Sequence, residues 1–195
     1  MFGQKRSASW RHWFIAVFAS GSALCLVGCG AEQLPESPSS ISPSPTNSSS
    51  FFESDDEALS AGVDGYMAYL KMSDEITASG GADAQRIRPF VSEELFPSFV
   101  DGYESLMSKE VRSEGSTAID SARLQTWIAD DAFASVSFYL CVDVSQIRLF
   151  DNAGNDVTPP DRAPRIPILA TVRVHNSTEG SVLTENEPWS GESFC

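Results

Sequence analysis

The sequence predicts an α+β fold in which helices pack on one face of an antiparallel sheet. Between residues 54 and 107, apolar side chains recur every three or four positions, as they do on amphipathic helices. From residue 122 onward, apolar and polar side chains alternate, as they do on half-buried strands. Because the helices precede the strands instead of alternating with them, the pattern favours separate helical and sheet layers.

Three helices are expected before the sheet. The first begins near the SDDE stretch at residues 54–57, because acidic groups stabilise a helix N-terminus, and it ends at residues 79–81, SGG. A shorter helix is expected from Asp83 to Phe90, and a third follows with Pro97 in its first turn. The apolar stripe of the first helix comprises Leu59, Val63, Tyr66, Met67, Leu70 and Ile76, and that of the third comprises Leu95, Phe99, Val100, Tyr103, Leu106 and Met107.

Five strands are expected, at residues 122–128, 132–143, 146–151, 165–176 and 181–189. The DNAGND stretch at 151–156 is predicted to be a hairpin turn, because its spacing does not match a calcium-binding loop. The side chains predicted to face the helices are Val136, Phe138, Leu140 and Val142 on one strand and Ile166, Ile168, Ala170, Val172 and Val174 on another.

The first 28 residues have the layout of a secretory signal peptide. Three basic residues precede an apolar run at 14–27, which is too short as a helix to cross a bilayer core of about 30 Å. The run ends in Leu26-Val27-Gly28-Cys29, which matches a bacterial lipobox. We expect cleavage before Cys29 and attachment of acyl chains such as palmitate, which would anchor the chain to the outer side of the cell membrane. The alternatives are a plain secreted protein with an unmodified cysteine and a permanent transmembrane helix.

Residues 29–53 are expected to be a disordered linker. This segment is rich in serine and proline and contains few large apolar side chains, so it cannot bury enough surface to fold. The globular domain is therefore predicted to span residues 54–195, raised above a membrane within the cell envelope by a semi-extended spacer.

The chain is strongly acidic. Its 195 residues carry a formal net charge of −14, and removal of the basic N-terminal segment makes the balance more negative still. Such a surface repels polyanions, which argues against a nucleic-acid partner. The cysteines left after processing and lipidation are Cys141 and Cys195. In an oxidising compartment two such cysteines predict one disulfide, and the alternatives are a reactive thiol pair or a metal site.

The stretch CVDVSQIRLFDNAGNDV (141–157), together with WSGESFC (189–195), resembles a group of small actinobacterial lipoproteins. Their domains are similar to the nuclear-transport-factor-2-like, or ketosteroid-isomerase-like, cone-shaped roll, also called cystatin-like. The resemblance implies a curved antiparallel sheet that encloses a pocket beneath the helices. It covers about residues 54–195 and implies no assigned activity.

In enzymes with that roll, tyrosine, aspartate and histidine line the pocket, so Tyr66, Tyr69 and Trp127 are the candidate pocket residues here. Asp143 lies on the strand face opposite the apolar stripe. We therefore expect Asp143 to cap the turn at Ser145 and not to act in catalysis. His175 is the single histidine after the signal peptide, and no motif predicts a metal or cofactor site. We therefore expect a non-catalytic domain that binds an envelope protein or a small apolar ligand. The alternative is a ketosteroid-isomerase-like or cyclase-like enzyme acting on a small apolar molecule.

Overall fold

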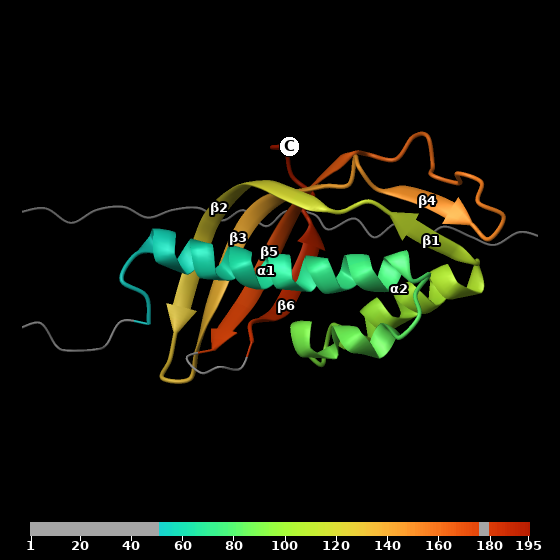
Figure 1. The fold of residues 1–195 in the computed structure, drawn as a ribbon. Coiled ribbons are helices and arrows are strands. Elements are labelled where there is room, and N and C mark those ends of the chain that lie inside the picture. The colour runs from blue at the N-terminus through green and yellow to red at the C-terminus, as the bar shows by residue number, and fades with distance from the viewer. Residues whose placement is uncertain (1–50, 176–179) are drawn as a thin grey trace, which may run out of the picture. The chain divides into compact units, whose positions relative to one another are not determined.

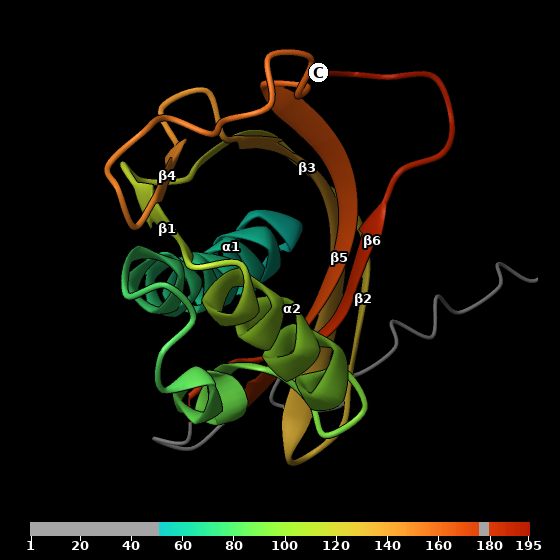
Figure 2. The same ribbon diagram turned by 90° about the vertical axis from the view of Figure 1, so that its right-hand side faces the viewer.

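Helix α1 (Asp55–Ala78) packs into the concave face of a curved antiparallel sheet (Figures 1 and 2). The computed structural model describes residues 51–175 and 180–195, so the signal peptide, Cys29 and most of the linker lie outside the described residues. The sheet is open and does not close into a barrel. These features confirm the predicted α+β class, with helices on one face of the sheet.

The main sheet has the strand order β2-β3-β5-β6, and every neighbouring pair is antiparallel. A separate two-stranded sheet, β1-β4, lies beyond its end (Figure 1). The strands are β1 (Val111–Glu114), β2 (Ala118–Ala129), β3 (Phe133–Asp143), β4 (Arg148–Asp151), β5 (Arg165–His175) and β6 (Val182–Pro188). Strand β1 was not expected from the sequence, and β2 begins before the predicted residue 122.

The helices begin and end where local sequence favours it. The Ser54 hydroxyl accepts a hydrogen bond from the Glu57 backbone N–H and so caps α1. The short second helix is a 3₁₀ helix, η1 (Ala84–Phe90), and helix α2 (Phe96–Ser108) has proline in its first turn, as predicted. Both pack against α1, and η1 also contacts β6.

The predicted inward faces form the core. Val136, Phe138 and Leu140 on β3 are fully buried, as are Ala170 and Val172 on β5. From α1, Tyr66 and Leu70 are buried against this surface, and Val63 is partly buried at its margin. The prediction that Phe99 and Tyr103 also pack on these strands was wrong, because α2 contacts α1, η1 and β1 instead of the main sheet. Phe99 packs edge-on against Tyr69 of α1, and the Tyr103 hydroxyl donates to Ser73.

Three residues assigned to the helix stripes, Met67, Leu106 and Met107, do not belong to the core. Met67 is 43% exposed and Met107 is 54% exposed, so this part of the prediction was wrong. Each helical residue is rotated about 100° from its neighbour, which places Met67 on the flank of the stripe beside the buried Tyr66. Met107 lies on the same face as the buried Tyr103, four residues earlier, but it occupies the last turn of α2 and is exposed there.

Two residues from the end of the predicted linker take part in the fold. Phe52 is buried, and its ring packs edge-on against Trp127 with the ring centroids 5.4 Å apart. Phe51 packs against the same cluster. In the described part of the chain, no helix combines the length and apolarity that a membrane crossing requires.

Candidate functional site

Tyr66 lies inside the domain, at the centre of an aromatic cluster. It is 1% exposed, and its ring makes edge-on contacts with Tyr69, at 5.4 Å between centroids, and with Phe138, at 6.2 Å. The Tyr66 hydroxyl donates a 2.9 Å hydrogen bond to Asn186 Oδ1. Burial raises the pKa of both tyrosines above the ordinary value, because the phenolate form would lose its hydration. These side chains fill the interior as core residues.

Trp127, the third candidate pocket residue, lies apart from the cluster around Tyr66. Its indole Nε1 donates a 2.9 Å hydrogen bond to Asp55 Oδ1, at the first turn of α1. Asp55 and Tyr66 are separated by three turns of helix, or about 16 Å along its axis. The structure therefore brings Tyr66 and Tyr69 together but does not bring Trp127 to them.

Asp143 caps the turn after β3. Its Oδ1 accepts a 2.8 Å hydrogen bond from the Ser145 backbone N–H, and hydrogen bonds from Ser145 lower the pKa of the Asp143 carboxyl. His175 ends β5, where it lies opposite Phe133 with the ring centroids 6.1 Å apart. Neither side chain joins the aromatic cluster around Tyr66. Among the described residues, no group of three or more histidine, cysteine or acidic side chains is arranged to hold a metal ion.

A groove with a volume of about 680 Å³ lies beside the C-terminal half of α1. We call it the α1 groove, and it is lined by Met67, Ala68, Leu70, Lys71, Asp74, Glu75, Ser116 and Thr117. The helix residues recur at three- and four-residue spacing and so present one face. The apolar side chains on that face, Met67, Ala68 and Leu70, lie beside the charged side chains of Lys71 and Glu75. A ligand in the groove would therefore contact both apolar and charged groups.

Asp74 ties the two sides of the α1 groove together. Its two carboxylate oxygens accept hydrogen bonds from the Thr117 backbone N–H, at 2.8 Å, and from the Thr117 hydroxyl, at 2.7 Å. This pair joins α1 to the segment between β1 and β2. Sequence reasoning missed the groove because it assigned Met67 to the core and assigned Thr117 to no element.

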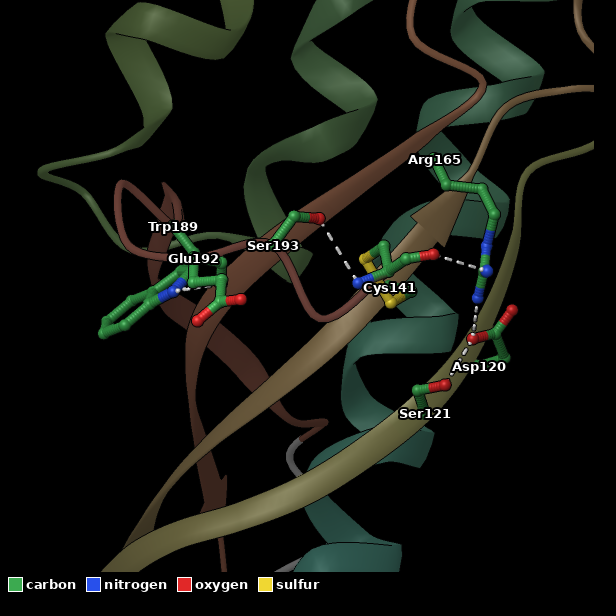
Figure 3. The surroundings of a disulfide bond; sticks show 8 residues. Asp120, Ser121, Cys141, Arg165, Trp189, Glu192 and Ser193 are labelled. Atoms are coloured by element: carbon green, nitrogen blue, oxygen red, sulfur yellow. Dashed lines mark hydrogen bonds and ion pairs between the residues drawn. A yellow bond between two sulfur atoms is a disulfide. The ribbon is translucent and has the colours of Figure 1, made fainter.

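The predicted disulfide is present, and it holds the C-terminal segment against the outer face of β3 (Figure 3). The Cα atoms of Cys141 and Cys195 are 5.7 Å apart. Arg165 on β5 donates a 2.8 Å hydrogen bond to the Cys195 carbonyl oxygen and forms an ion pair with Asp120 on β2. The C-terminal residue is therefore bonded directly to β3 and β5, and Arg165 connects it in turn to β2.

Comparison with known proteins adds little to this description. No family model matches the chain, and no curated protein matches it. Among solved structures, the chain is similar to the intermembrane space region of the chloroplast protein ARC6, with a TM-score of 0.43 and 12% identity. That match covers 66% of this chain and 93% of the ARC6 chain. The function must be argued from the side chains described above.

Proposed function

We propose that this chain is a lipid-anchored extracytoplasmic protein whose folded domain binds a small apolar molecule in the α1 groove without transforming it. The observation that carries the binding part is the groove itself, whose volume of about 680 Å³ lies within the usual range of small-molecule sites. Met67, Ala68 and Leu70 supply its apolar wall, and the other lining residues are polar or charged.

The anchoring part rests on the sequence and on the compartment that the disulfide implies. Leu26-Val27-Gly28-Cys29 ends an apolar run that follows a basic start, which is the order of a lipoprotein signal. Disulfides persist in oxidising compartments, and the Cys141–Cys195 bond is consistent with export. Cys29 itself lies outside the described residues.

Binding is favoured over catalysis because the residues an isomerase-like site would use are already engaged. That chemistry needs a tyrosine donor and a carboxyl group facing one cavity. Here the Tyr66 hydroxyl donates to Asn186 within the core, and Asp143 accepts from Ser145 at a turn. In the α1 groove, Asp74 is held by two hydrogen bonds from Thr117.

Metabolic labelling with an alkyne fatty acid tests the anchor. The wild-type chain and Cys25→Ser should be labelled equally, because Cys25 belongs to the segment that cleavage removes. Cys29→Ser should lose the label and accumulate with its signal peptide. Equal labelling of Cys29→Ser and wild type would contradict the proposed anchor.

The groove is tested with N-phenyl-1-naphthylamine, a neutral dye whose fluorescence rises in apolar sites. The protein would begin at Asn47, four residues before the described part of the chain. Met67→Gln should weaken saturable dye binding at least fivefold, because it places a polar group on the groove wall. Met107→Gln is the matched control, since Met107 is also exposed but lies outside the groove, and it should bind as wild type does. Unchanged binding by Met67→Gln would contradict the proposed site.

A further inference from the structure

Three aromatic side chains meet on the outer face of the sheet, on the side opposite α1. Tyr139 lies on β3, Trp189 follows β6, and Phe194 belongs to the C-terminal segment. The Tyr139 ring stands at 76° to the Trp189 ring, with the centroids 5.1 Å apart, and at 75° to the Phe194 ring, with the centroids 6.0 Å apart. We call these three residues the aromatic box, in which two steeply inclined rings flank a third.

The aromatic box borders an open hollow. A hollow of about 350 Å³ is lined by its three residues and by Glu192. Trp189 is 37% exposed, so part of its indole ring faces solvent at this hollow. The rings thus present both apolar surface and π-electron faces to solvent.

Several contacts hold the aromatic box in place before any ligand arrives. The Trp189 backbone N–H donates to the Pro167 carbonyl oxygen at 2.8 Å, and the indole Nε1 donates to the Glu192 carbonyl oxygen at 3.2 Å (Figure 3). A Cβ atom added at Gly191 would lie 2.5 Å from the indole Nε1, so only glycine allows the chain to pass this close to the ring. The Cys141–Cys195 disulfide fixes the residue that follows Phe194.

The charges around the hollow favour a cation. Glu192 lines it and is exposed, so its carboxylate is available to a ligand. Glu187 pairs with Leu169, which pairs with Tyr139, so all three lie in one row on the outer face. Arg123 is the register partner of Tyr139 on β2, and it therefore lies on the side of Tyr139 away from β5 and β6.

We propose that the aromatic box, with Glu192, binds a quaternary or methylated ammonium group of the choline type. A cation is attracted to the faces of aromatic rings, and this attraction strengthens where the rings exclude water. The Glu192 carboxylate would add direct charge attraction, and methyl groups on the nitrogen would contact the ring surfaces. This site lies apart from the α1 groove and does not depend on the function proposed for that groove.

The test compares choline with 3,3-dimethylbutan-1-ol, which has the same shape but carries carbon in place of the charged nitrogen. The full chain would be purified in a non-ionic detergent, and binding would be followed by ligand-observed NMR of the methyl protons. Choline should bind about tenfold more tightly than its neutral analogue, in keeping with the strength of a partly desolvated cation–π contact. Equal binding of the two compounds, or no saturable choline binding, would overturn the proposal.

Variants separate the contributions of the rings and the charge. Trp189→Ala should abolish saturable choline binding, and Trp127→Phe, which changes a tryptophan outside the box, should leave it unchanged. Glu192→Gln should weaken choline binding about threefold while leaving the neutral analogue unaffected, and Arg123→Gln should strengthen choline binding. An intact disulfide and an unchanged melting temperature would show that each variant is folded. Loss of binding in Trp127→Phe, or no change in either Trp189→Ala or Glu192→Gln, would refute the assignment.

Two sources of this headgroup can be distinguished. Free glycerophosphocholine should compete with choline whether the site serves soluble compounds or lipids. Phosphatidylcholine vesicles should compete only if the site reaches a membrane surface, and phosphatidylglycerol vesicles are the control. If a neutral saccharide saturated the aromatic box while choline did not, the box would be a carbohydrate platform and the cation proposal would be wrong.

Discussion

The Tyr66 hydroxyl and the Asn186 side chain join the middle of α1 to the edge strand β6 through a 2.9 Å hydrogen bond. Asn186 is the register partner of the buried Ala170, so its side chain faces the helix layer. Strand β6 carries several polar residues and would otherwise offer α1 little apolar surface at this point. The bond adds a polar contact to the apolar one that the buried Leu183 of β6 makes with the core, and it offsets the cost of desolvating the two polar groups.

Replacement of Tyr66 by phenylalanine should therefore destabilise the domain by about 1 kcal/mol, because the Asn186 oxygen loses its donor. Asn186→Ala should cost a similar amount. Urea unfolding of the two single variants and the double variant measures the coupling directly. The double variant should be clearly less destabilised than the sum of the singles, and strict additivity would show that the two side chains do not interact in solution.

Gly65 marks the closest approach of α1 to the sheet. A Cβ atom at this position would lie 2.6 Å from Ser181 Cβ and 2.7 Å from Val172 Cγ1. Gly65→Ala should lower the free energy of unfolding by about 1–3 kcal/mol, because the helix must move away from β5. Gly102→Ala in α2 is the matched control, since nothing lies within 4 Å of its added Cβ. It should raise stability by about 0.5–1 kcal/mol through helix propensity alone, and equal effects of the two changes would contradict this packing.

The disulfide closes a loop with a sequence separation of 54 residues. In the chain-entropy model, a loop of this length contributes about 4 kcal/mol to stability. Cys141→Ser should therefore lower the melting temperature markedly, and a reducing agent should lower the melting temperature of the wild type but not of the variant. A thiol assay on the unfolded, unreduced fragment beginning at Asn47 should detect no free thiol in the wild type. Two free thiols there would exclude the bond.

Asp156 should titrate at unusually low pH. Hydrogen bonds from Thr158, and then from the Arg148 guanidinium, lower the pKa of the Asp156 carboxyl to about 2. A depressed pKa in the folded state means that the ionised group stabilises the fold above the unfolded pKa of about 4, and that this contribution is lost as the pH falls through about 2. Carboxyl-carbon NMR should give this low midpoint, and Arg148→Gln should raise it. An ordinary midpoint in the wild type would contradict the contacts.

Local sequence determined much of this protein. Ser54 before three acidic residues predicts the start of α1, and the structure places the cap there. The alternation of Val136, Phe138 and Leu140 predicts which face of β3 is buried. Both signals are short-range, because capping depends on residues within one turn and strand faces depend on a period of two. The lipoprotein signal is also local, and it stays a prediction until labelling tests it.

Tertiary structure alone decided the rest. Strand β1 is four residues long and polar, so only its pairing with β4, far along the chain, identifies it. The α1 groove depends on Thr117 reaching Asp74, and the aromatic box depends on a disulfide that returns Phe194 to Tyr139. Each of these sites joins residues that are distant in sequence. The periodicity of the sequence does not predict these contacts. A period indicates which face of an element a residue occupies, but not which other segment that face will contact.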